Sequence, residues 1–260
     1  MPEHPRITYV RILSFGEKTL EELTKVLQDR PVEALLIDLR DDAGGLFTAA
    51  VGMCEMFVPQ GEIVSTRGRN GKVLRTYAAS GKTVLDPQVP IAVLVNHYSA
   101  SASEIVAACL QDHGRAKIIG QRTWGKGTVQ NIFTLEGGKA ALKLTTAGYW
   151  RPSGKNIHRL RGVKDDADWG VKPDPGFEVV LTDVEANQVR KQRHQRDAGR
   201  DAVKPEELNE ANGTDAQDSG ANDTEGKDDT EDNDSKPFED PQLRKAIEYL
   251  ETQLKSPPIK

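Results

Sequence analysis

The stretch IAVLVNHYSASASEIVAACLQD, residues 91–112, decides the fold of this chain. An unbroken apolar run comes first, which favours a strand, and after a short polar interval apolar residues recur with helical spacing. Ser101 stands where the second segment begins. The sequence therefore predicts a strand, a turn and a helix, with a serine hydroxyl at the helix start.

Similar patterns occur along the rest of the chain. The run ALLIDLR (34–40) is apolar almost throughout, which suits a strand covered on both faces, and LFTAAVGMCEMF (46–57) indicates the helix that covers it. Asn70-Gly71 is a hairpin signal, and a second hairpin is expected across residues 136–139. These patterns predict an α/β fold of repeated βα units with an added sheet of β-hairpins.

A second chemical signal lies in TWGKGTVQ (123–130), where Lys126 stands between two glycines that allow unusual dihedral angles. A serine hydroxyl is a weak nucleophile and must hand its proton to a base as it attacks a carbonyl. Lysine can be that base only when uncharged, so its pKa must fall from about 10.4 toward roughly 7 to 8, which desolvation achieves. Trp124 and Val129 are the expected desolvating walls. The sequence thus predicts a Ser101 nucleophile with Lys126 as its base.

An oxyanion site is expected at the start of the same helix. The first amides of a helix have no partner within it and carry the positive end of its dipole, so the amide of Ala102 is the first expected donor. The second is expected from the turn that follows residues 34–40, where Gly44 or Gly45 can direct its amide toward the same point. Together these donors would bind the negative oxygen of a tetrahedral intermediate.

Three segments, in matching order, carry a family resemblance: LLIDLRDDAGGL (35–46), VLVNHYSASASEIVAACLQD (93–112) and IIGQRTWGKGTVQ (118–130). They resemble the C-terminal processing proteases, also called tail-specific proteases, and the resemblance runs from about Ile7 to Val180. It implies a ClpP/crotonase-like core and a serine endopeptidase with a Ser-Lys dyad. Such an enzyme cleaves protein or peptide substrates near their C-terminal tails through an acyl-enzyme, without a metal or organic cofactor.

The resemblance also assigns roles by motif. It implies that Ser101 is the nucleophile, that Lys126 is the base and that Gln130 orients the lysine. Ser99 and Ser103 are then supporting residues.

The sequence departs from the family in two places. Relatives carry an Asn-Pro-Gly-Gly-like turn where this chain reads Asp42-Ala43-Gly44-Gly45, although the glycines of the oxyanion role remain. Relatives also place a signal peptide, a helical segment and a PDZ domain before the strand that here begins at Ile7. We therefore expect a PDZ-bearing partner or a missing N-terminal region. Without a signal peptide the location of this chain stays unassigned, while the resemblance implies the periplasm or cell envelope for a full-length parent.

Composition separates one stretch from the rest of the chain. Residues 204–235 hold twelve acidic side chains against two lysines and almost no large apolar residue, which predicts disorder. After this stretch, apolar residues return on one helical stripe that includes Leu243 and Leu250. We expect four parts: a serine peptidase core (1–182), a charged helix (183–200), a disordered acidic linker (201–237) and a C-terminal amphipathic helix (238–260).

Several other classes of function are not expected. The positive residues are scattered over strands and turns, so nucleic-acid binding does not follow, and no run approaches the roughly 20 apolar residues of an integral membrane segment.

Other residues with possible chemical roles are given simpler interpretations. The five histidines show no metal spacing, and His97 is only a minor alternative to Lys126 as the base. Glu104 is interpreted as a partner of the helix dipole. Cys54 and Cys109 lie in apolar helical patterns typical of buried thiols, and whether they pair stays open. The alternative function is a catalytically silent, protease-like interaction module.

Overall fold

The computed structural model describes residues 3–164, 167–198 and 238–255, and the acidic linker expected at 201–237 lies outside them. The chain forms two compact units, of which the first combines Met1–Val180 with Pro241–Lys260 and the second is Leu181–Asp240. In the second unit, helix α4 spans Asp183–Ala198, where the charged helix was expected. The candidate catalytic residues all belong to the first unit. None of the helices in the described part of the chain is long and apolar enough to cross a membrane.

A parallel sheet of four strands forms the centre of the first unit, in the order β1-β2-β5-β6. The two middle strands, β2 and β5, are buried at every residue, as their unbroken apolar sequences predicted. The strands are β1 (Ile7–Arg11), β2 (Ala34–Asp38), β5 (Ile91–Val95) and β6 (Lys117–Gly120).

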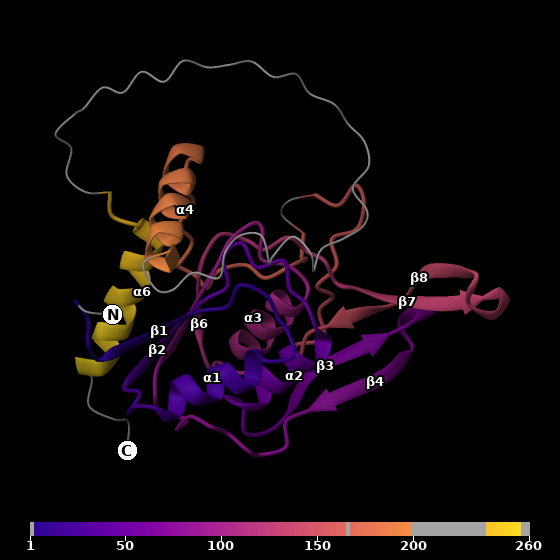
Figure 1. The fold of residues 1–260 in the computed structure, drawn as a ribbon, viewed down its shortest axis with the longest axis horizontal. Coiled ribbons are helices and arrows are strands. Elements are labelled where there is room, and N and C mark those ends of the chain that lie inside the picture. Colours follow the sequence, from indigo (N-terminus) through magenta and orange to yellow (C-terminus); the bar gives the residue numbers. More distant parts are fainter. Residues whose placement is uncertain (1–2, 165–166, 199–237, 256–260) are drawn as a thin grey trace. The chain divides into compact units, whose positions relative to one another are not determined.

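Helices cover both faces of this sheet (Figure 1). Helices α1, α2 and α3 lie on one face, and α6, the last helix of the chain, lies on the other. The helices are α1 (Thr19–Gln28), α2 (Phe47–Glu55), α3 (Ala102–Asp112) and α6 (Pro241–Lys255). The predicted α/β fold of βα units and a C-terminal helix is therefore confirmed.

The alternation of side chains along the strands produces these layers. Leu35 and Val93 pack into the core that α1, α2 and α3 share, whereas Leu36 and Leu94, one position further along, pack with Leu250 of α6. Successive side chains of a strand point to opposite faces, so each central strand contributes to two apolar cores.

The hairpins form a second, antiparallel sheet in the order β4-β3-β8-β7. Both predicted hairpins are confirmed, with short 3₁₀ turns η1 (Arg69–Gly71) and η2 (Glu136–Gly138) at their tips. Asn70 has a φ of 59° and Gly71 a φ of 73°, as a tight hairpin turn requires. The strands are β3 (Glu62–Arg67), β4 (Val73–Ala78), β7 (Thr128–Leu135) and β8 (Ala140–Trp150).

The two cysteines are free thiols inside the core. Cys54 lies on α2 and Cys109 on α3, and both side chains are buried. Burial raises the pKa of the Cys54 thiol well above its ordinary value, and a hydrogen bond with Cys109 adds to the shift. The interpretation of both as buried, structural thiols is confirmed.

Candidate active site

Ser101 lies between β5 and α3 in a backbone conformation that residues with a Cβ rarely adopt. Its φ is 58° and its ψ is −111°. Such conformations cost about 1–3 kcal/mol and persist only where the surroundings enforce them. The amide of Ser101 donates to Oε2 of Glu104 at 2.9 Å, and the preceding amide, that of Ala100, donates to the carbonyl of Asp42 at 3.0 Å. The half-buried serine is thus held from two directions.

Two buried hydroxyls tie this turn to the segment that follows β2. Ser99 Oγ donates to the carbonyl of Leu39 at 2.8 Å, and Ser103 Oγ donates to the carbonyl of Asp42 at 3.0 Å. Both serines are completely buried, so neither hydroxyl is open to a substrate. They support the turn, as the resemblance implied.

Gly44 packs directly against the serine turn. Its φ is 103°, and a Cβ at this position would lie 2.7 Å from the carbonyl oxygen of Ala100, 2.8 Å from the amide nitrogen of Ala102 and 2.9 Å from Cβ of Ser101. Contacts this short would force the turn to move. The close approach of the two turns therefore requires glycine here.

The three expected oxyanion donors differ in what their amides do. The Gly44 amide donates to Oδ1 of Asp42 at 2.8 Å. Ala102 is the first residue of α3, and neither its amide nor that of Gly45 donates to another described residue. Among the described residues, the amides of Ala102 and Gly45 thus have no hydrogen-bond partner, whereas the amide of Gly44 has one.

Glu104, which the sequence indicated only as a partner of the helix dipole, makes further contacts in the structure. Its side chain is fully buried and accepts four hydrogen bonds. Oε2 accepts from the amides of Ser101 and Lys126, at 2.9 and 2.8 Å. Oε1 accepts from the Thr123 hydroxyl at 2.6 Å and from the Gly125 amide at 2.7 Å. Burial raises the pKa of Glu104, and these hydrogen bonds oppose the rise.

One of these four contacts had a signal in the sequence. A serine followed three residues later by glutamate is the spacing of a capping box, in which the glutamate accepts from the backbone of the serine. The contacts from Thr123, Gly125 and Lys126 had none, because they join segments distant in sequence.

Ser101 and Lys126 meet at Glu104, because a single carboxylate oxygen accepts both backbone amides. Their side chains are not joined: the Lys126 side chain is exposed, and within the described residues no hydrogen bond links its amine to the Ser101 hydroxyl. Trp124 is 48% exposed, and its ring lies 5.2 Å from that of His97. The apolar enclosure that we expected around the lysine amine is not formed in this structure.

Gln130 and Val129 both have other partners. Gln130 is exposed on β7, and its Nε2 donates to Oγ1 of Thr145 on β8 at 2.6 Å, so the expected contact with Lys126 is not made. Val129 is partly buried and packs against the main hydrophobic core. The structure therefore brings together the backbones of Ser101 and Lys126, but not the three expected catalytic side chains.

Asp42 is a buried carboxylate beside this site. Burial raises its pKa from the ordinary value of 3.8 to about 6, against the opposing effects of the hydrogen bond from Gly44 and the charge of Arg11. Oδ1 is bonded to Gly44, whereas Oδ2 is buried with no hydrogen-bond partner among the described residues. An ionised Asp42 therefore destabilises the native state.

Asp42→Asn is expected to stabilise the protein at neutral pH. In the wild type, protonated Asp42 contributes to the free energy of unfolding below about pH 4, and this contribution is lost as the pH rises through 6. The reason is that the carboxyl of the unfolded chain releases its proton at a lower pH. The loss amounts to about 3 kcal/mol at most. Asparagine keeps the acceptor for Gly44 and has no charge. Chemical denaturation should show the variant more stable than wild type at pH 7.5 and nearly equal at pH 4.

Asp86→Asn, at an exposed aspartate, is the control for this comparison. A stability difference between wild type and Asp42→Asn that is the same at both pH values would contradict the assignment of the raised pKa to Asp42.

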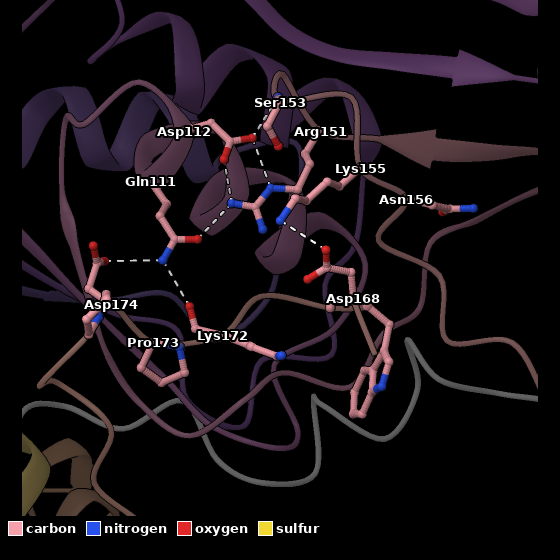
Figure 2. A pocket seen from close by; sticks show the side chains of 13 residues that line it. Gln111, Asp112, Arg151, Ser153, Lys155, Asn156, Asp168, Lys172, Pro173 and Asp174 are labelled. Carbon is pink, nitrogen blue, oxygen red and sulfur yellow. Dashed lines mark hydrogen bonds and ion pairs between the residues drawn. The ribbon is translucent and has the colours of Figure 1, made fainter. Parts of the chain in front are cut away.

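A separate cavity of about 330 Å³ lies at the other end of α3 (Figure 2). Arg151 pairs with Asp112 at 2.6 Å, and Lys155 pairs with Asp168 at 3.0 Å. Burial alone would raise the pKa of Asp112, but hydrogen bonds from Arg151 and Ser153 and the charge of Arg151 hold it below its ordinary value. Within each pair, the positive and the negative charge neutralise each other. Among the described residues, no group of three His, Cys, Asp or Glu is placed to hold a metal ion.

Comparison with known proteins gives matches that all name peptidases. Residues 6–174 match the family described as Peptidase family S41. The carboxy-terminal-processing protease of Bartonella bacilliformis is 40% identical over 223 residues, which cover 79% of this chain and 51% of that protein. The carboxyl-terminal-processing protease of a Picosynechococcus strain is 36% identical over 164 residues, which cover 62% and 39%. This chain thus spans about half, or less, of the length of these curated relatives.

A solved structure agrees with the sequence matches. The photosystem II D1 C-terminal processing protease superposes with a TM-score of 0.58 at 34% identity, and the match covers 67% of this chain and 42% of that one. Mature CPAF superposes with a TM-score of 0.51 at 17% identity, which supports the fold alone.

Proposed function

The chain belongs to peptidase family S41, and from this membership we propose that it forms the catalytic core of a serine endopeptidase that cleaves protein substrates near their C-termini. A PDZ-bearing region, in the same or another polypeptide, is proposed to deliver the tail. A periplasmic or cell-envelope location of the full-length parent is part of the same proposal.

The observation that carries the proposal is the shared contact of Ser101 and Lys126 with one oxygen of Glu104. It supports a dyad because two segments distant in sequence bring the backbones of a serine and a lysine to one place. The strained turn at Ser101 supports it further, since backbone strain of this kind clusters at active sites.

In the proposed reaction, Ser101 Oγ attacks the scissile carbonyl carbon while the uncharged amine of Lys126 takes the hydroxyl proton. The amides of Ala102 and Gly45 stabilise the resulting oxyanion. The carbon–nitrogen bond then breaks, and Lys126 returns the proton to the leaving amine. Water then attacks the acyl carbon while Lys126 takes its proton. The ester bond to Ser101 Oγ breaks, Lys126 returns the proton to Oγ, and the new C-terminal carboxylate leaves.

Gln130 remains part of this proposal as the residue that orients Lys126. A change of rotamer would have to break its bond to Thr145. Because Lys126 is exposed in the structure described here, we propose that the bound substrate supplies the dry surroundings that a lysine base needs.

A serine-directed fluorophosphonate tests the nucleophile without requiring the natural substrate. We expect one label per folded chain, located at Ser101 by peptide mass spectrometry, and at least about 100-fold slower labelling after denaturation, because the free hydroxyl is weakly nucleophilic. Hydrolysis of an unstructured polypeptide is measured in parallel. A folded chain that takes up no label and hydrolyses nothing would favour the silent interaction module.

A further inference from the structure

We propose that Glu104 is a positioning residue that fixes the Ser101 nucleophile and the Lys126 base relative to each other by accepting hydrogen bonds from the backbone of both. The inference rests on the proposed function and deepens it. Glu104 lies on the first turn of α3, whereas the lysine segment lies between β6 and β7. One side chain therefore joins two segments that follow the paired strands β5 and β6 and share one backbone hydrogen bond, from the Trp124 amide to the Ser99 carbonyl at 3.0 Å.

The two carboxylate oxygens of Glu104 each accept two hydrogen bonds, from different groups. Oε2 bridges the amides of Ser101 and Lys126, and so sets the distance between their backbones. Oε1 holds the Thr123 hydroxyl and the Gly125 amide, which fixes the path of the loop that leads to the lysine. The Thr123 hydroxyl also accepts from the amide of Val171 at 2.8 Å, so the loop is anchored on its other side.

The need for a carboxylate follows from the four donors around it. An ionised carboxylate only accepts hydrogen bonds and offers two oxygens, whereas a glutamine replaces one oxygen with an NH₂ group that can only donate. In place of Oε2 that group would face two backbone amides, and in place of Oε1 it would face the Gly125 amide and the Thr123 hydroxyl. A hydroxyl can turn to accept, so glutamine loses at least one backbone contact in either orientation.

A helix cap alone does not explain this arrangement. A glutamate that only caps a helix can stay at the surface, because it needs one contact with the backbone of the serine. Burying a carboxylate is costly unless hydrogen bonds compensate, and Glu104 is fully buried with three donors from the lysine segment. These contacts hold the backbone of the two residues that carry the reacting groups. A displacement of about 1 Å in reacting groups can slow a reaction about 100-fold.

The test compares Glu104→Gln with wild type in the whole chain. We expect kcat for polypeptide hydrolysis and the rate of fluorophosphonate labelling at Ser101 to fall about 10- to 100-fold, with KM within about twofold, because the peptide still binds but meets a displaced dyad. Asp174→Asn is the matched control. Asp174 also accepts hydrogen bonds from a backbone amide and side chains, those of Ile118, Lys117 and Gln111, outside the candidate site.

Thermal denaturation of each variant confirms that the assay temperature lies in the folded range. A folded Glu104→Gln that keeps at least half of the wild-type kcat and labelling rate would overturn the proposal, as would a loss matched by Asp174→Asn. If Glu104→Gln does not fold, Thr123→Val decides instead. It removes one of the four bonds, so labelling should slow about 3- to 10-fold, and an unchanged rate in the folded variant overturns the proposal.

Different experimental results would contradict the proposed function and the positioning role of Glu104. A wild type that neither labels nor hydrolyses contradicts the peptidase. Hydrogen exchange then still tests the contacts: the amides of Ser101, Gly125 and Lys126 should be protected in wild type and exchange faster in Glu104→Gln, while the rest of α3 stays protected. Equal exchange in both proteins would refute the role of Glu104.

Discussion

Replacement of Ser101 with alanine is expected to lower kcat for peptide hydrolysis by about 10⁴-fold or more, because the variant has no nucleophile at the oxyanion site. Lys126→Met should cause a loss of the same order. Methionine approximates the length of lysine but cannot accept the hydroxyl proton. Both rates are measured with a quenched fluorescent peptide, and both variants should keep the thermal stability of wild type within a few degrees, since Ser101 is only half-buried and Lys126 is exposed.

The double variant distinguishes a dyad from two independent contributions. Residues that act as a unit are strongly non-additive, so Ser101→Ala/Lys126→Met should be little slower than either single variant. Lys155→Met removes a lysine from an exposed ion pair with Asp168 and is expected to leave kcat within about twofold. If Lys126→Met keeps more than a tenth of the wild-type rate, lysine is not the base.

Gly44→Ala is expected to reduce kcat by about 10³-fold and to destabilise the fold by roughly 2–4 kcal/mol. The added methyl group would lie against Ala100, Ala102 and Ser101, and the atoms it meets are backbone atoms or a Cβ, which cannot rotate away. The amide of Ala102, a proposed oxyanion donor, would be covered or displaced. Steady-state kinetics and denaturant unfolding measure the two effects.

Gly71→Ala separates the clash from backbone strain. Gly71 also has a positive φ, of 73°, but a Cβ there would meet nothing within 4 Å. This control should lose about 1 kcal/mol of stability and no activity. A Gly44→Ala variant that behaves like Gly71→Ala would show that the space beside Ser101 is not needed for catalysis.

The sequence predicted correctly the strands and turns whose structure depends on residues close together in the chain. The apolar runs at 34–38 and 91–95 predicted buried strands, and Asn70-Gly71 predicted a hairpin, because burial and turn geometry constrain the residue types at each position. The C-terminal amphipathic helix was also predicted from a local pattern. Leu243 and Leu250 form one apolar stripe, and both are buried against the sheet.

The candidate site was less predictable, because its geometry depends on contacts between distant segments. Nothing near Lys126 in sequence indicates that Glu104 accepts its amide. The turn at Asp42 suggested that either glycine could donate to an oxyanion, but the buried carboxylate takes the amide of Gly44. Side-chain rotamers such as that of Gln130 depend on the facing strand, in this case on Thr145.

The packing of α6 decides how far this protein can be shortened. Residues 6–174 match the family, yet a fragment with those ends would lose the helix that covers Leu36 and Leu94. It would also lose Gln242, whose Oε1 accepts a hydrogen bond from the buried side chain of Arg40 at 3.1 Å. A recombinant fragment limited to residues 6–174 would thus expose one apolar face of the parallel sheet. If such a fragment were inactive, the cause would be low solubility and not the lack of a catalytic residue.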